Sequence, residues 1–266
     1  MDIVNIAAYK FISLPESYIQ WQPIMQERCD ALELKGTIIL ASEGINLVLA
    51  GERANIDAIV DFLKTDELFE GSFSDLTPKE SISDSKPFGK MVVRLAKEII
   101  TMRVPDMDPV KKGRGASVDS QTLQRWLKQG HDDDGREVVM LDTRNTYETD
   151  IGTFKNAITL EIERFSEFPE AIAKTVAEQE ELKEKTVVSF CTGGIRCETA
   201  VLYMNGIEMQ RVYQLEGGIL KYFEETGGEH WQGECFVFDD RVAVDASLNK
   251  TAKDYPRHIG PRDTMS

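Results

Sequence analysis

Residues 186–204 read TVVSFCTGGIRCETAVLYM, an apolar β-branched run followed by a glycine-containing turn and then a helical pattern. The run at 186–190 predicts a buried strand, and the apolar spacing at 198–204 predicts a helix. A strand that passes through a tight turn into a helix is typical of parallel α/β sheets. Ligands of such sheets bind beyond the carboxyl ends of the strands, which is where this turn lies.

The turn begins with a cysteine, Cys191. Two glycines allow the backbone N–H groups to point into one concavity, and the start of the helix adds partial positive charge. Arg196 would add a fixed charge, so we expect Cys191 to have a lowered pKa and to react as a thiolate. A buried and inert cysteine explains the glycines and the arginine less well. The residues expected to bind an anion or substrate are Thr192, Gly193, Gly194, Ile195 and Arg196.

Around this unit, short apolar strands alternate with helical patterns. Strands are predicted at 138–142 and 211–215, and helices at 120–129 and 168–184. Such alternation predicts a parallel α/β sheet with helices on both faces.

The first part of the chain has a different order of elements. Strands are predicted at 3–11, 36–41, 47–51 and 91–95, and helices at 15–34 and 54–64. The order β-α-β-β-α-β predicts a ferredoxin-like α+β sandwich with an antiparallel sheet. Residues 42–46 form the expected turn, in which Glu43-Gly44-Ile45-Asn46 is either a functional loop or only a turn built from glycine and asparagine.

Composition limits the class of protein. A chain of 266 residues is long enough for two domains, each with its own core. No apolar run approaches the ~20 residues of a membrane-spanning helix, so we expect a cytoplasmic protein without a membrane partner. Four cysteines, two of them in one loop, argue against a disulfide scaffold. Three widely spaced histidines and no Cys-x-x-Cys pair argue against a zinc site.

The net charge of −15 normally counts against a nucleic-acid partner. Between residues 86 and 114, however, eight basic residues outnumber three acidic ones. This strip either faces a polyanion such as RNA or is a solvated strand edge and linker. Its candidate RNA-binding residues are Lys111, Lys112 and Arg114.

Residues 142–148, 152–158 and 191–196 resemble, in turn, the strand-end signature, the glycine segment and the six-residue active loop of the rhodanese family. Asp142 and Arg144 are expected to support the loop, as a structural ion pair or by bracing it directly. Thr153 and Asn156 depart from the family pattern in a structural segment.

Longer motifs are similar to those of the rhodanese-containing tRNA uridine hydroxylases. They lie at residues 43–46, 151–154, 167–169, 191–198, 215–222 and 233–244. This resemblance implies oxygen-dependent 5-hydroxylation of the wobble uridine, position 34, of tRNA, with Cys191 as the essential residue. Many members continue into a cysteine-rich segment that residues 249–266 do not match.

Together the patterns and the resemblance predict four segments. Residues 1–96 form the ferredoxin-like, or acylphosphatase-like, domain, and 97–115 a linker rich in proline, glycine and charge. Residues 116–240 form the rhodanese-like catalytic domain, and 241–266 a C-terminal tail.

The residues alone leave the chemistry open. A nucleophilic thiolate also suits a sulfurtransferase of the thiosulfate or persulfide type, or a persulfide-carrying binding module. Molecular oxygen is the implied co-substrate, a small-molecule sulfur or oxygen donor is a further partner, and no metal or organic cofactor is evident from the motifs. Cys197 either resolves an oxidised Cys191 or packs behind the loop. Trp126, Trp231 and Tyr222 either stack on a base or belong to the core or to a helix surface. Cys29 and Cys235 are expected in the core. The oligomeric state is left open.

Overall fold

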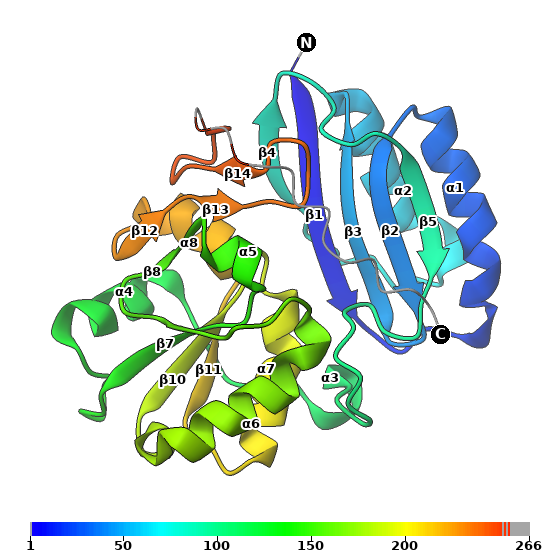
Figure 1. Ribbon diagram of the computed structural model, residues 1–266. Coiled ribbons are helices and arrows are strands. Elements are labelled where there is room, and N and C mark those ends of the chain that lie inside the picture. Colours follow the sequence, from blue (N-terminus) through cyan, green and yellow to red (C-terminus); the bar gives the residue numbers. More distant parts are fainter. Residues whose placement is uncertain (1, 252, 254, 256–266) are drawn as a thin grey trace. The chain divides into compact units, whose positions relative to one another are not determined.

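The computed structural model of the chain describes residues 2–251, 253 and 255 (Figure 1). It divides into two compact units, Met1–Thr101 and Met102–Ser266. This division falls inside the segment 97–115 that the sequence predicts to be a linker.

The first unit contains a five-stranded sheet in the order β4-β1-β3-β2-β5. The strands are β1 (Ile3–Phe11), β2 (Lys35–Ala41), β3 (Gly44–Gly51), β4 (Lys79–Ser83) and β5 (Met91–Leu95). Strands β4, β1, β3 and β2 pair antiparallel in the ferredoxin-like order. Because β3 already begins at Gly44, only two residues of the predicted turn at 42–46 separate it from β2.

The assignment of the last ferredoxin strand to residues 91–95 was wrong. Lys79–Ser83 pairs with β1 and completes the motif, whereas β5 adds to β2 in parallel at the opposite edge. The sequence of β4, KESIS, offers one large apolar residue, and that residue, Ile82, is half exposed. A polar edge strand of this kind has no apolar run by which it could be found.

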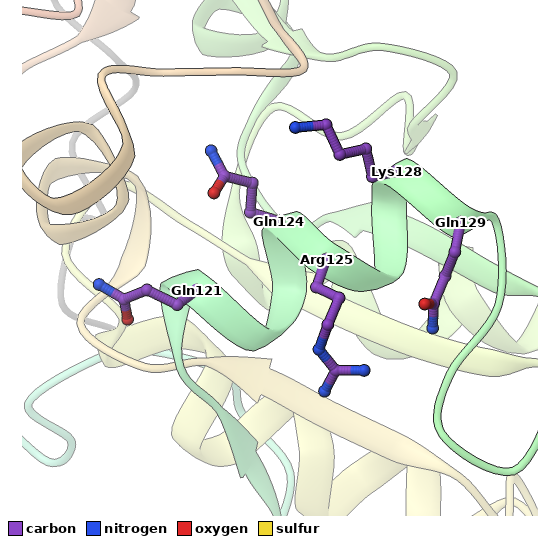
Figure 2. Close-up of a pocket in the computed structure, with 5 residues that line it drawn as sticks. All are labelled: Gln121, Gln124, Arg125, Lys128 and Gln129. Carbon is purple, nitrogen blue, oxygen red and sulfur yellow. The ribbon is translucent and has the colours of Figure 1, made fainter.

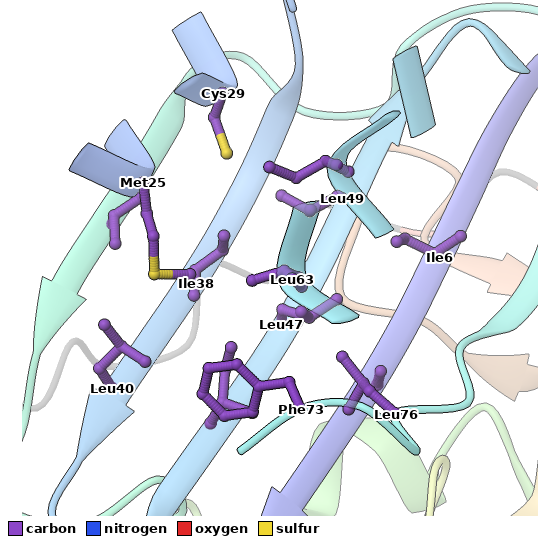
Figure 3. Packing of buried hydrophobic residues seen from close by; sticks show 14 of the residues in the cluster. Ile6, Met25, Cys29, Ile38, Leu40, Leu47, Leu49, Leu63, Phe73 and Leu76 are labelled. Atoms are coloured by element: carbon purple, nitrogen blue, oxygen red, sulfur yellow. The ribbon is translucent and has the colours of Figure 1, made fainter. Parts of the chain in front are cut away.

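The helices of the first unit cover one face of its sheet. They are α1 (Trp21–Ala31) and α2 (Arg53–Thr65), with short 3₁₀ turns η1 (Glu16–Gln20) and η2 (Glu67–Phe69). The helix predicted at 15–34 is thus divided, since Pro23 lacks an N–H and fits only the first turn of α1. Figure 3 shows Met25 and Cys29 of α1 and Leu63 of α2 pointing toward the strands. Cys29 is a core residue, as predicted.

The second unit contains a sheet in the order β6-β11-β10-β7-β9, in which all neighbours are parallel. Its strands are β6 (Ser117–Val118), β7 (Val138–Asp142), β9 (Ile158–Thr159), β10 (Thr186–Phe190) and β11 (Val212–Leu215). The predicted parallel sheet and its three predicted strands are confirmed. All five residues of β10, the strand that leads to Cys191, are buried.

The second unit also contains helices and short 3₁₀ turns. They are α3 (Pro109–Lys112), α4 (Ser120–Gln129), α5 (Thr146–Thr149), α6 (Phe168–Glu178), α7 (Ile195–Gly206) and α8 (Gly218–Thr226), with 3₁₀ turns η3 (Phe165–Glu167) and η4 (Glu180–Lys183). Residues of α4 and α8 share one core with strand residues Val188 and Phe190. Figure 1 shows α6 and α7 on the near face of the sheet.

The same core contains two of the three aromatic residues for which base stacking was an alternative, and the third packs against it. Trp126 and Tyr222 are buried in it, and Trp231 packs against it. Trp231 also lies edge-on to Phe154, with ring centroids 5.2 Å apart. The interpretation as core residues is therefore confirmed for Trp126 and Tyr222.

Two small antiparallel pairs lie beside the main sheet. β8 (Gly152–Phe154) pairs with β12 (Trp231–Gly233), and β13 (Cys235–Phe236) pairs with β14 (Ala243–Val244). Cys235 is in the core, as predicted. The segment 241–266, expected to be a tail, contains β14 close to its beginning. Residues 252, 254 and 256–266 of this segment lie outside the described part of the chain. Within the described part of the chain, no helix is both long and apolar enough to span a membrane.

Candidate active site

Cys191 lies in the loop between β10 and α7, where the sequence places it. Gly194 caps α7 with a φ of 98°, a conformation that residues with a side chain rarely adopt. The backbone N–H of Gly194 donates a hydrogen bond to the Cys191 Sγ at 3.1 Å. The loop therefore directs its N–H groups at the sulfur atom.

A second glycine pair supports the loop from α8. The N–H of Ile219 donates to the Cys191 carbonyl at 3.0 Å, and that of Leu220 to the Thr192 carbonyl at 3.2 Å. This contact requires Gly218, because a Cβ there would lie 2.5 Å from the Cys191 carbonyl oxygen and 2.7 Å from the Gly194 nitrogen. The carbonyls of the loop are thus held on the side of α8.

The thiol of Cys191 is buried, with 1% of the residue exposed. Burial opposes ionisation, but four groups outweigh it and lower the pKa of Cys191 to about 6. In decreasing order they are the side-chain hydrogen bond with Cys197, the charge of Arg196, and the N–H groups of Arg196 and Gly194. The direction is the one expected from the loop sequence. The largest favourable contribution, from Cys197, was not expected.

Cys197 lies in the first turn of α7 and is fully buried. Burial, followed by its hydrogen bond with the Cys191 thiolate, raises the pKa of Cys197 well above its ordinary value. The Thr143 hydroxyl lies 3.8 Å from its sulfur atom. Cys197 therefore lies buried behind the loop, and its raised pKa keeps it a thiol beside the more acidic Cys191.

Arg196 is 5% exposed and does not stand alone. Its Nη1 lies 2.7 Å from Oε2 of Glu148, and its Nη2 donates to Oε1 of the same carboxylate at 3.0 Å. Glu148 also accepts a hydrogen bond from the N–H of Asn145 at 3.1 Å in the capping box of α5. The carboxylate offsets part of the positive charge that Arg196 brings to Cys191. Glu148 is the last residue of the strand-end signature at 142–148, but its contact with Arg196 was not predicted from the sequence.

Asp142 and Arg144 form the ion pair expected of them. Arg144 donates to the two carboxylate oxygens of Asp142 at 2.9 and 2.7 Å, and both side chains are fully buried. Arg144 also donates to the Gly152 carbonyl at 2.6 Å, and the Thr153 hydroxyl donates to Asp142 at 2.7 Å. The pair therefore fastens the end of β7 to β8, which supports its structural interpretation.

The three candidate RNA-binding residues lie in or next to α3. Lys111 and Lys112 end α3, and Lys111 lies 3.4 Å from Asp108. The Arg114 guanidinium is bound by both carboxylate oxygens of Glu198, a residue of the first turn of α7. Arg114 thus connects the basic segment to the helix that follows the Cys191 loop, a role that the sequence did not indicate.

A surface hollow of about 470 Å³ lies elsewhere, along one face of α4 (Figure 2). It is lined by Gln121, Gln124, Arg125, Lys128 and Gln129. None of these residues belongs to the predicted site, and Arg125 and Lys128 pair with neighbouring carboxylates. Among the described residues, no group of three or more histidine, cysteine or carboxylate side chains is placed to hold a metal ion.

The comparisons with known proteins match both units. Residues 3–99 match the UPF0176 acylphosphatase like domain, and residues 123–225 match the Rhodanese-like domain. A protein of Burkholderia thailandensis named tRNA uridine(34) hydroxylase is 57% identical over 252 residues, or 95% of this chain and 83% of that protein. A protein of the same name from Burkholderia vietnamiensis is 57% identical over 251 residues, or 94% of this chain and 87% of its own length.

Proposed function

Since this chain belongs to the tRNA uridine(34) hydroxylase family, we propose that it hydroxylates C5 of uridine 34 in tRNA, with Cys191 as the reacting side chain and molecular oxygen as co-substrate. One observation carries the proposal: the Cys191 sulfur accepts an amide N–H at 3.1 Å and has its pKa lowered to about 6. A thiol with this pKa is mostly thiolate at neutral pH, and the thiolate is the nucleophilic form.

The thiolate supplies what hydroxylation at C5 requires. C5 of uridine becomes nucleophilic when an anion adds to the neighbouring C6, because the electrons of the C5–C6 double bond move toward C5 and the C4 carbonyl. In the proposed reaction the Cys191 thiolate forms this bond to C6. The activated C5 then attacks an electrophilic oxygen.

The oxidant that fits this step is a hydroperoxide, ROOH, formed from molecular oxygen and a reduced organic co-reactant, RH. C5 takes up the terminal OH group, the O–O bond breaks, and RO⁻ leaves. Loss of the C5 proton to RO⁻ then re-forms the double bond and expels the Cys191 thiolate. Uridine is oxidised by two electrons, the O–O bond is reduced by the same two, and the products are 5-hydroxyuridine and ROH.

The other residues of the site act on the thiolate. The Cys197 thiol, with its raised pKa, stays protonated and donates to Cys191, and Arg196 supplies positive charge. Glu148 is a positioning residue, since it touches Arg196 rather than the sulfur. Because Cys191 is 1% exposed, the target base has to leave the anticodon stack to reach it.

Binding of tRNA needs positive charge in this acidic protein. Lys111 and Lys112 are suited to contact phosphates, since both are exposed and their helix is connected through Arg114 to α7. A tRNA substrate also agrees with action in the cytoplasm, the compartment expected from the sequence.

Sulfur transfer is the second candidate, because the N–H groups that hold the Cys191 thiolate also suit a terminal persulfide sulfur. Attack of the thiolate on the outer sulfur of thiosulfate would break the S–S bond, release sulfite and leave a Cys191 persulfide. Cyanide would then accept the sulfane sulfur as thiocyanate and regenerate the thiolate.

Nucleoside mass spectrometry of bulk tRNA from a gene-deletion strain separates the two candidates. Hydroxylation predicts that 5-hydroxyuridine disappears on deletion, returns with the wild-type gene only in the presence of oxygen, and does not return with Cys191→Ser. Unchanged 5-hydroxyuridine in the deletion strain, together with Cys191-dependent release of thiocyanate by the purified protein, would support sulfur transfer instead.

A further inference from the structure

Phe238 is a large apolar side chain with no role in the proposed chemistry, and it is 51% exposed. It lies in the motif at residues 233–244, between β13 and β14. Single exposed apolar residues are common on protein surfaces. The exposure of Phe238 alone therefore does not indicate a binding role.

The turn that carries Phe238 is held at several points. The N–H of Val237 donates to the Val242 carbonyl at 2.9 Å, and the N–H of Val242 donates to the Asp239 carbonyl at 2.9 Å. The guanidinium of Arg241 binds the Asp239 carboxylate at 2.6 to 3.1 Å, and both side chains are less than 10% exposed. The position of Phe238 is thus fixed by its neighbours before any ligand arrives.

The ring of Phe238 covers the arginine of the active loop. The guanidinium carbon of Arg196 lies 5.5 Å from the ring centroid, within the range of a cation–π contact. The same guanidinium acts on the Cys191 thiol through its charge. Arg196 is therefore in contact with the exposed ring and also acts on the reactive sulfur.

The turn is also joined to the loop by an aromatic row. The ring centroid of Phe238 lies 5.0 Å from that of Phe236, which lies 5.3 Å from that of Tyr147 in α5. The hydroxyl of Thr192 donates to the Phe236 carbonyl at 3.4 Å. The row supports the ring of Phe238 edge-on, as aromatic pairs prefer, and fixes its position relative to Cys191.

From this arrangement we propose that Phe238 is a stacking platform for a nucleobase of the anticodon loop at the entrance to the Cys191 site. The inference rests on the proposed function, because it takes tRNA as the substrate. A base that has left its stack loses the stacking contacts with its neighbours. An aromatic side chain can replace them, and stacking on it contributes about 1–3 kcal/mol of binding free energy per base. Phe238 offers such a face from a rigid turn, with the positive charge of Arg196 on its inner side.

The test is binding of an anticodon stem–loop RNA that contains unmodified U34, measured without oxygen so that turnover does not contribute. Phe238→Ala and Phe238→Leu are expected to weaken binding about tenfold, which corresponds to about 1.4 kcal/mol. Phe238→Trp is expected to bind as tightly as wild type, and its added fluorescence to be quenched by the RNA. Leucine keeps the apolar contact and lacks the aromatic face, so it is the matched control for stacking.

Two further measurements keep the interpretation specific. The free energy of unfolding and the pKa of Cys191 should be the same in the Phe238→Leu and wild-type proteins. A leucine variant that binds RNA as wild type does would overturn the proposal, and so would an altered Cys191 pKa with unchanged binding. Loss of the proposed function would appear differently, as 5-hydroxyuridine that persists in the deletion strain while the binding series still depends on Phe238. A wild-type protein that binds no RNA would overturn both.

Discussion

Oε2 of Glu148 lies 2.7 Å from Nη1 of Arg196, and both side chains are buried. A buried charge that loses its partner is strongly destabilising, since neither water nor another group replaces the lost contact. We therefore expect Glu148→Gln to lower the free energy of unfolding by about 3–5 kcal/mol in urea denaturation. The exposed Glu170 of α6 provides the control, and Glu170→Gln should change this free energy by less than about 0.5 kcal/mol. Equal changes in the free energy of unfolding for the two variants would show that the buried pair stabilises the fold no more than an exposed carboxylate does.

The ionisation of Cys191 is expected to occur about three pH units below that of an ordinary cysteine, near pH 6 rather than 9.0. The ultraviolet absorbance of the thiolate, measured as the difference between wild type and Cys191→Ala, should rise between pH 5 and 7, on the order of one unit either side of the pKa. A difference spectrum that rises only near pH 9 would contradict the lowered pKa.

The same lowered pKa predicts how stability depends on pH. Between pH 6 and 9.0 the folded protein holds a thiolate at Cys191, whereas the unfolded chain still binds the proton. Stability rises with pH wherever the unfolded state binds more protons, so the contribution of Cys191 grows across this window and is lost below it. Urea denaturation of wild type and Cys191→Ala at several pH values measures the contribution. A difference that does not change with pH would argue against it.

The hydrogen bond with Cys197 is expected to help lower the pKa of the Cys191 thiol. Cys197→Ala removes the donor and should raise the pKa of Cys191, whereas Cys197→Ser keeps a donor of similar size and should largely preserve it. The thiolate absorbance titration distinguishes the two variants. If alanine and serine shift the titration equally, the effect comes from packing rather than from the hydrogen bond.

Gly218 is expected to tolerate no side chain. Its φ is 68°, and a Cβ would lie 2.5 Å from the Cys191 carbonyl oxygen, so Gly218→Ala has to displace the loop. We expect a loss of several kcal/mol of stability and of wobble uridine modification in complemented deletion strains. A Cβ added at Gly206 in α7 would meet no neighbouring side chain or distant backbone within 4 Å. Gly206→Ala should therefore leave the free energy of unfolding unchanged or raise it slightly. A Gly218→Ala protein that retains full stability and activity would contradict the close packing of α8 on the loop.

Charge reversal of Lys111 and Lys112 is expected to weaken tRNA binding and its dependence on salt. The magnitude of the slope of log K against log salt concentration should fall by about two, one for each lost phosphate contact. Lys174, an exposed lysine of α6, is the control site, where Lys174→Glu should change the slope little. Arg114 is less suitable for this test, because its reversal also breaks the contact with Glu198. Unchanged binding by the double variant would make α3 part of the linker only.

The elements around Cys191 could be predicted because each is encoded by a pattern within its own few residues. The apolar run at 186–190 forms β10, and the amphipathic pattern at 120–129 forms α4 with the predicted bounds. The elements that were missed depend on distant partners. β4 is a polar edge strand recognisable only by its pairing with β1, and β13 and β14 have two residues each.

The same distinction applies to the site. The loop sequence was enough to predict a thiol that ionises easily, since glycines and an arginine act within a few residues of it. Glu148 and Phe238 reach Arg196 from segments more than forty residues away along the chain, and no spacing rule connects them. The donor role of Cys197 is close in sequence but depends on how the loop turns its sulfur atoms toward each other.

The contact between α8 and the loop also has a consequence for biosynthesis. The residues that hold the loop carbonyls, Ile219 and Leu220, follow Cys191 and β11 in the chain and are therefore translated after both. A nascent chain that ends before α8 lacks these contacts, so we expect the loop that carries Cys191 to be fully held only after α8 has been translated.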